Sequence, residues 1–154
     1  MVHYELTFTV PSPGGYTTFI EFSPSGRFLA VVGRDSPSLY ILDKLAGFHP
    51  TLSTTIPAKP TALVWEPSSQ AFYVGLDDGR FIHYRIDLEG KKLVEGVTNH
   101  MFHGAFPVTS MALDTGSKTL VLSVGPGVFA FRRIRTTSVF RLFMNWSRGL
   151  TFPR

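Results

Sequence analysis

The sequence predicts an all-β protein made of three similar units of short antiparallel strands. Hydrophobic residues make up 44% of the 154-residue chain and charged residues only 17%, while Gly and Pro number 14 and 11. This composition is typical of short strands separated by frequent turns. Apolar and polar residues also alternate over stretches of about six residues, which is the period of a strand and not of a helix. The third observation is that the chain repeats itself.

The repeat is visible in residues 17–44, 60–87 and 107–134. They read TTFIEFSPSGRFLAVVGRDSPSLYILDK, PTALVWEPSSQAFYVGLDDGRFIHYRID and PVTSMALDTGSKTLVLSVGPGVFAFRRI. Each begins with an alternating stretch, continues through a small polar turn to an apolar strand, and then passes a Gly-containing turn to a third strand. The spacing is 43 residues from Phe22 to Trp65 and 47 from Trp65 to Ala112. A period in the forties with three strands visible indicates the blades of a β-propeller.

Each repeat predicts three strands in chain order. The first strands are expected at 17–22, 60–65 and 107–113, the second at 28–33, 71–76 and 119–124, and the third at 38–43, 80–86 and 128–134. Asp78-Gly79 is a hairpin-turn sequence between two of them. An outer fourth strand is expected at 51–57 and at 92–102. The alternating residues 3–10 predict a further outer strand ahead of the first blade.

The motifs FSPSG…LAVVGRD…LYILDK and LVWEPSS…FYVGLDDGRFIHYR resemble the WD-repeat β-propeller family over roughly residues 3–134. The Trp-Asp pair of that family aligns with Leu42-Asp43, Tyr84-Arg85 and Arg132-Arg133, so only Asp43 is retained. The further positions that the resemblance matches are the turn Asp (Asp35 and Asp78), the His before the first strand (His103) and the small hydroxyl residue (Ser123). The hydrogen-bonded tetrad of the family is complete in none of the three repeats.

The predicted domain therefore comprises blades at 17–57, 60–102 and 107–134 together with the strand at 3–10. A propeller ring needs about 4–8 blades, so three blades leave apolar faces uncovered. Phe19, Phe22 and Phe28 of the first blade and Phe129 and Phe131 of the third are expected on these faces. We therefore expect closure by oligomerisation. In a head-to-tail homodimer the two copies would form a six-bladed ring, and residues 3–10 could complete the third blade of the partner. The alternative is that the chain is a fragment of a larger propeller.

Residues 135–154 form a basic segment. All eleven acidic residues precede position 115, whereas Arg132 to Arg154 contains six Arg and no acid. A period of two favours a C-terminal strand, and an unstructured tail is the alternative; the two alternating sets are Phe140, Leu142, Met144 and Trp146, and Val139, Arg141, Phe143 and Asn145. Binding of nucleic acid or an anionic membrane is a third interpretation, but we expect no specific nucleic-acid partner and no membrane partner. No signal peptide or transmembrane segment is visible, which favours a cytoplasmic or nuclear location.

Catalytic and metal-binding motifs are missing from the sequence. The chain has no Cys, and neither a Gly-x-Ser-x-Gly elbow nor a phosphate loop is present. His100 and His103 have a spacing that could serve zinc, but no third ligand is apparent. Glu21 and Glu66 fall in different blades and are not expected to converge as an acid–base pair. We therefore expect a protein without metal or cofactor that is not an enzyme.

The resemblance implies a non-catalytic scaffold that mediates protein–protein interaction through propeller loops. The loops that WD-repeat proteins present to partners correspond here to positions carrying Arg34, Lys59, Asp77, His103 and Phe106. Arg and aromatic residues are enriched at binding hot spots. The alternative function is a carbohydrate-binding, lectin-like propeller, which needs an exposed aromatic platform. Trp65 is expected to be buried in its strand, so this alternative depends on Trp146.

Overall fold

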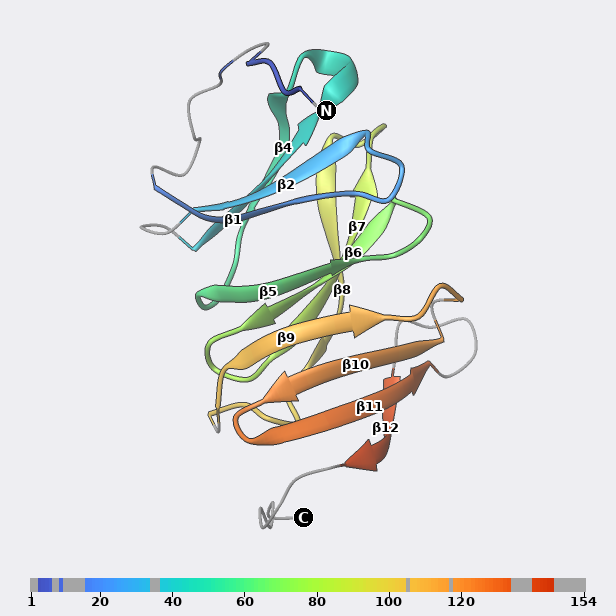
Figure 1. Ribbon diagram of the computed structural model, residues 1–154. Coiled ribbons are helices and arrows are strands. Elements are labelled where there is room, and N and C mark those ends of the chain that lie inside the picture. The colour runs from blue at the N-terminus through green and yellow to red at the C-terminus, as the bar shows by residue number, and fades with distance from the viewer. Residues whose placement is uncertain are drawn as a thin grey trace.

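The computed structural model consists of three four-stranded antiparallel sheets that follow one another along the chain (Figure 1). It describes residues 3–6, 9, 16–33, 37–104, 106–116, 118–133 and 140–145. Blade 1 contains β1 (Thr17–Phe22), β2 (Phe28–Gly33), β3 (Ser38–Asp43) and β4 (His49–Thr55). Blade 2 contains β5 (Pro60–Trp65), β6 (Ala71–Leu76), β7 (Phe81–Asp87) and β8 (Lys92–Asn99). Blade 3 contains β9 (Val108–Leu113), β10 (Thr119–Val124), β11 (Gly127–Arg133) and β12 (Phe140–Asn145). The all-β, partial-propeller prediction is confirmed.

The inner strands of the blades lie where the sequence predicts them, while the outer strands differ. Strands β1, β2, β3, β5, β6 and β10 have the expected bounds, and β7, β9 and β11 are displaced by one residue. The prediction that the outer strand of blade 2 reaches residue 102 is wrong, because β8 ends at Asn99 and a turn follows. Phe102 is buried in that turn, 4.4 Å from Phe129 between ring centroids. Burial of this ring against blade 3 bends the chain away from the sheet.

The predicted strand at 3–10 is not present in the described part of that segment. Residues 3–6 and 9 have no strand assignment, and the other residues of the segment lie outside the described part of the chain. The outer strand of blade 3 is β12, which pairs antiparallel with β11 and places Arg132 opposite Arg141. A sheet edge accepts only one strand, so residues 3–10 of a partner cannot complete this blade. The structure thus forms a strand within the basic segment 135–154.

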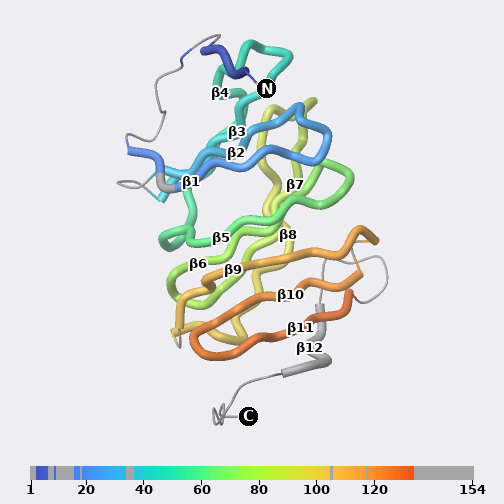
Figure 2. The backbone as a smooth tube through the Cα atoms, viewed as in Figure 1, coloured from blue at the N-terminus to red at the C-terminus, as the bar shows by residue number. Residues whose placement is uncertain are grey.

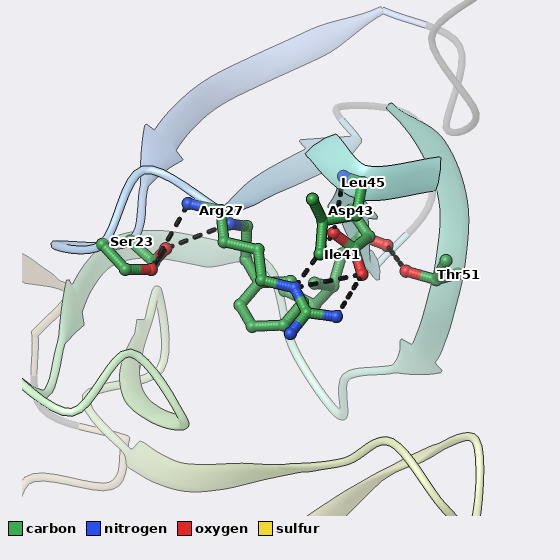
Figure 3. A network of polar contacts seen from close by, with 8 residues as sticks. Ser23, Arg27, Ile41, Asp43, Leu45 and Thr51 are labelled. Atoms are coloured by element: carbon green, nitrogen blue, oxygen red, sulfur yellow. Dashed lines mark hydrogen bonds and ion pairs between the residues drawn. The ribbon is translucent and has the colours of Figure 1, made fainter. Parts of the chain in front are cut away.

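A polar network secures the end of β3 in blade 1 (Figure 3). Arg27 donates through Nη2 to Asp43 Oδ2 at 2.8 Å and through Nε to Oδ1 at 3.2 Å. Asp43 Oδ1 also accepts from the Leu45 backbone N–H at 2.9 Å, which caps the short 3₁₀ helix η1 (Lys44–Ala46). Hydrogen bonding from Arg27 lowers the pKa of Asp43. The acidic residue that matches the WD-repeat pattern therefore has a structural role within its own blade.

The three blades stack in order, with blade 2 in the middle (Figure 2). Side chains of each inner strand point alternately to the preceding and the following blade. Between blades 1 and 2, for example, Ala30 and Val32 share one buried cluster with Phe72, Val74 and Tyr84. The second seam, between blades 2 and 3, buries Tyr73 and Phe81 from blade 2 with Leu120, Leu122, Val124, Phe129 and Phe131 from blade 3. Most of the hydrophobic core therefore lies between blades.

Blade 1 has an apolar face that no other described part of the chain covers. Ile20 and Phe22 are 60% and 52% exposed, and behind them lie the buried Val31, Leu42 and Phe48. The expectation is wrong for Phe28, Phe129 and Phe131, since these three side chains are buried in the seams between blades, and for Phe19, which packs partly buried against the first seam. Alternation along the strand directs them inward. Within the described residues, no helix has the length and apolar character needed to span a membrane.

Candidate functional site

Four connections gather at one edge of the stacked blades, on the left in Figure 1. They are the β4–β5 and β8–β9 loops and the β6–β7 and β10–β11 turns. The first loop is tied to the first turn, because the Asp77 N–H donates to the Lys59 carbonyl at 2.9 Å and the Lys59 N–H donates to Asp77 Oδ1 at 3.2 Å. The second loop is tied to the same turn by the Gly104 N–H, which donates to the Asp78 carbonyl at 2.7 Å.

The β6–β7 turn is packed tightly beneath the β8–β9 loop. Gly79 has φ +87°, a left-handed conformation that favours glycine. A Cβ atom at this position would clash with the backbone carbonyls of Phe102 and Phe106. At the next turn the Phe106 ring lies directly against Gly125. The loops are therefore held by backbone contacts, which gives this edge a defined shape.

Asp78 is the most heavily engaged charged group of this edge. Its carboxylate accepts from Arg80 Nε at 2.8 Å and from the Arg80 backbone N–H at 3.1 Å. His103 Nε2 lies 3.9 Å from Asp78 Oδ2. Desolvation opposes ionisation of the carboxyl, but hydrogen bonds from Arg80 outweigh it and lower the pKa of Asp78. Asp78 therefore stabilises the turn through contacts within the chain, and a ligand would contact other side chains of this edge.

The structure brings together four of the five residues predicted as partner-binding. Lys59 and Asp77 are exposed, the His103 side chain is 56% exposed, and Phe106 is 40% exposed. Arg34, the fifth, lies outside the described residues. We call Lys59, Asp77, Asp78, His103 and Phe106 the loop surface. It combines both signs of charge with an exposed aromatic ring.

A pocket of about 420 Å³ adjoins the loop surface between the outer strands of blades 1 and 2. Arg80 and His100 line it on the side of blade 2, together with Glu95 and Thr98 of β8. The end of β4 and the residues after it form the opposite wall. The pocket extends the polar character of the loop surface toward the outside of the molecule.

The described residues contain no group of three His, Cys, Asp or Glu side chains placed to hold a metal ion. His100 and His103 lie beside each other, with 5.9 Å between ring centroids. Trp65 is 4% exposed, and its Nε1 donates to the Glu21 carbonyl at 3.3 Å. It is therefore a core residue and offers no platform for a sugar, while Trp146 lies outside the described residues.

Sequence analysis missed a second polar cluster at the opposite edge of the blades. Glu66, His83 and Arg133 converge there, although they belong to three different segments. His83 is buried within its blade. The only local signal was an acidic residue directly after an apolar strand.

No family model matches this sequence, and no curated protein matches it. Solved structures do match. A 6-phosphogluconolactonase candidate from Bacteroides fragilis shares 12% identity with a TM-score of 0.73, covering 91% of this chain and 41% of that one. Sqt1 from Chaetomium thermophilum bound to the N-terminus of ribosomal protein L10 shares 16% identity with a TM-score of 0.68, covering 86% and 36%. A chain of the mitotic checkpoint complex shares 16% identity with a TM-score of 0.63, covering 77% and 37%.

These similarities concern the fold alone, because all the identities are low. The chain spans about two fifths of the length of the propeller chains that it matches. The resemblance to WD-repeat proteins thus agrees with the architecture, while membership of that family stays a prediction.

Proposed function

We propose that this chain is a non-catalytic interaction module that binds a protein partner through the loop surface. The observation that carries the proposal is the convergence of Lys59, Asp77, His103 and Phe106. They come from three separate connections and remain accessible on one edge that backbone hydrogen bonds hold in place. An exposed aromatic ring among charged groups suits recognition of a polypeptide. Arg34 is included in the proposed surface on the basis of the sequence.

Two further points support a binding role over catalysis. The sequence contains none of the nucleophile or phosphate-loop motifs that an enzyme of those classes would need. Among proteins of similar fold, Sqt1 was solved with the N-terminus of a ribosomal protein bound. A fold of this kind therefore accommodates a peptide segment. The likeness to the 6-phosphogluconolactonase candidate is at 12% identity and carries no activity over to this chain.

The proposal can be tested by comparing two charge-altered variants in quantitative affinity purification. Lys59→Glu with His103→Ala changes the loop surface, and Lys91→Glu with Glu89→Ala changes exposed residues at the opposite edge. We expect specific partners to be lost with the first pair and retained with the second. Binding of a purified partner should then weaken about tenfold or more for the loop-surface pair. Equal retention of all partners by both pairs would contradict the proposal.

We also propose that two copies close head to tail. The uncovered face of blade 1 has large side chains, including Ile20, Phe22 and Tyr40, at positions equivalent to those that blades 2 and 3 bury against the blade before them. On the outer face of blade 3, the described side chains of β9, β10 and β11 are mostly smaller, with Arg132 as the large exception. They include Ala112, Val121, Ser123, Val128 and Ala130. A large face of one copy therefore meets a small face of the other, as in the seams within the chain.

Light scattering tests this closure directly. The dimer predicts a molar mass twice the monomer's 17.1 kDa. Phe22→Asp should give the monomeric mass, because it places a charge on the contact face. Leu88→Asp, which alters an exposed residue in the β7–β8 turn, should leave the dimer intact. A wild-type monomer at micromolar concentration would overturn the head-to-tail dimer and leave the loop-surface proposal standing.

A further inference from the structure

The edge opposite the loop surface contains a buried polar cluster in the seam between blades 2 and 3. Glu66 follows β5, His83 lies in the middle of β7, and Arg133 ends β11. Glu66 is 8% exposed and His83 is 7% exposed. Glu66 Oε1 lies 3.3 Å from His83 Nε2 and 3.6 Å from Arg133 Nη1. The Tyr73 hydroxyl also donates to Glu66 Oε1, at 3.2 Å.

The surrounding residues hold this cluster in a fixed arrangement. The Tyr73 ring lies against the His83 imidazole, with 4.7 Å between centroids. Gly96 of β8 leaves room for the same imidazole, because a Cβ there would meet His83 Nδ1 at 2.8 Å. His83 Nε2 is fully buried, and the polar group that faces it is Glu66 Oε1 at 3.3 Å.

A pocket of about 400 Å³ opens beside this cluster. Besides the cluster, its lining includes Ser68, Gln70 and Arg85. Arg85 comes from β7 and Arg133 from β11, so the two cations reach the pocket from different blades. The pocket volume lies within the range of small-molecule sites in proteins.

Charge indicates which kind of ligand the pocket suits. The two Arg residues carry two positive charges, and Glu66 is the single acidic group in the lining. The contact with His83 lowers the pKa of Glu66 against the opposing desolvation, and Arg133 lowers it further, so the carboxylate is ionised at neutral pH. Its Oε1 already faces Tyr73, His83 and Arg133. The lining therefore has one net positive charge, which favours an oxyanion over a cation.

We propose that this interblade pocket binds a phosphate monoester group. In this assignment Arg85 and Arg133 provide the charged contacts, and the Ser68 hydroxyl and Gln70 amide donate to further oxygens. Guanidinium groups bind phosphate oxygens in a paired geometry that lysine cannot reproduce. The site lies at the opposite edge from the loop surface and does not depend on the function proposed for that surface.

The test is a titration of the full chain with inorganic phosphate, followed by two-dimensional NMR at constant ionic strength set with chloride. We expect saturable shifts confined to signals from the seam between blades 2 and 3. Arg85→Gln removes an exposed charge at the pocket and should weaken phosphate binding about tenfold or more. Lys92→Gln removes an equal charge from the same blade outside the pocket, and its affinity should equal that of the wild type.

Parallel titrations distinguish the two sources of such a group. A hexose phosphate and a phosphoserine peptide both carry the monoester, and tighter binding of either one than of inorganic phosphate identifies the source. Unchanged unfolding curves for Arg85→Gln verify that the variant is folded. Absence of saturable shifts with all three probes would overturn the proposal. An equal loss of affinity in Lys92→Gln would also overturn it, because the effect would then be one of general charge.

Discussion

The two seams of this molecule use the same blade geometry but differ in chemistry. Between blades 1 and 2 the buried side chains are almost wholly apolar, and the rings of Trp65, Phe72 and Tyr84 pack against one another there. Between blades 2 and 3 an apolar centre is bordered by Glu66, His83 and Arg133. The first seam is suited to stability, whereas the second combines stability with a polar pocket.

The difference between the seams arises at two equivalent positions of the repeat. The residue directly after the first strand is Ser23 in blade 1 and Glu66 in blade 2. Ile41 of β3 in blade 1 is equivalent to His83 of β7 in blade 2, because each follows an equivalent residue, Leu39 or Phe81, by two positions. In blade 1 the Ser23 hydroxyl caps its own turn by accepting from the Phe28 N–H at 3.0 Å. These two differences, together with Arg133 from blade 3, give the second seam a charged edge.

The largest loss of stability is expected from truncating Trp65 in the apolar seam between blades 1 and 2. Trp65→Ala removes a buried ring that lies 4.9 Å from Phe72 and is hydrogen-bonded across to blade 1. We expect a loss of about 3–5 kcal/mol in the free energy of unfolding, measured by urea denaturation followed by circular dichroism. Trp65→Phe should cost much less because it preserves ring packing. A loss below about 1 kcal/mol for the alanine variant would show that this seam contributes little.

A smaller loss of stability is expected from substituting Gly79, at the loop end of the seam between blades 2 and 3. Gly79→Ala combines a left-handed backbone with a clash against the β8–β9 loop, so we expect a loss of about 2–3 kcal/mol. Gly26 is a matched control, since its φ is +70° but a Cβ atom added there would meet no other atom within 4 Å. Gly26→Ala should cost only about 1 kcal/mol. Equal losses of stability for Gly79→Ala and Gly26→Ala, in thermal or urea unfolding, would mean that packing of the β8–β9 loop against Gly79 does not contribute to stability.

The ion pair inside blade 1 should have a weaker effect than either seam. Asp43→Asn removes the bidentate contact with Arg27 and weakens the cap of η1, and we expect a loss of about 1–2 kcal/mol. The Arg27 side chain is 39% exposed, so solvent screens the pair. A double-mutant cycle with Arg27→Gln should assign only a small part of this loss to the pair. A coupling near zero would attribute the whole effect to the cap.

The smallest effect is expected from removing the charge in the second seam, and it should depend on pH. The pKa of Glu66 is lower in the folded chain than its unfolded value of about 4.3, so its stabilisation is present above that pH and is lost as the pH falls through the folded pKa. Glu66→Gln should therefore lose up to about 1 kcal/mol at pH 7, and its difference from the wild type should shrink as the pH falls through the folded pKa of Glu66. Trp65→Phe provides the contrast, because its difference from the wild type should not vary with pH. A pH-independent difference for Glu66→Gln would rule out this linkage.

Sequence reasoning located the inner strands because their signals are local. In β6 and β10 the apolar stretch and the turn residues on either side lie within about ten residues, and no distant contact overrides them. The end of β8 could not be found in this way, since it depends on Phe102 packing against Phe129 of another blade. The outer edge of blade 3 also had two candidate strands with equal alternation, and only three-dimensional pairing distinguishes them.

The two candidate sites also differ in whether local sequence signals could predict them. The loop surface was predicted because the repeat places equivalent loops at one edge, and Lys59, Asp77, His103 and Phe106 follow from that regularity. The polar cluster was missed because Glu66 and His83 are 17 residues apart and Arg133 follows 50 residues later. No local pattern indicates that these three side chains share a pocket.

By itself, the sequence determined that the chain forms repeated four-stranded sheets and which loops share an edge, because strand period, turn chemistry and repeat length are properties of neighbouring residues. Only the tertiary structure decided which faces are buried, which strand completes blade 3, and that Glu66, His83 and Arg133 meet beside a pocket. Those outcomes depend on how one blade packs against the next, and packing energy is a property of contacts between residues far apart in the chain.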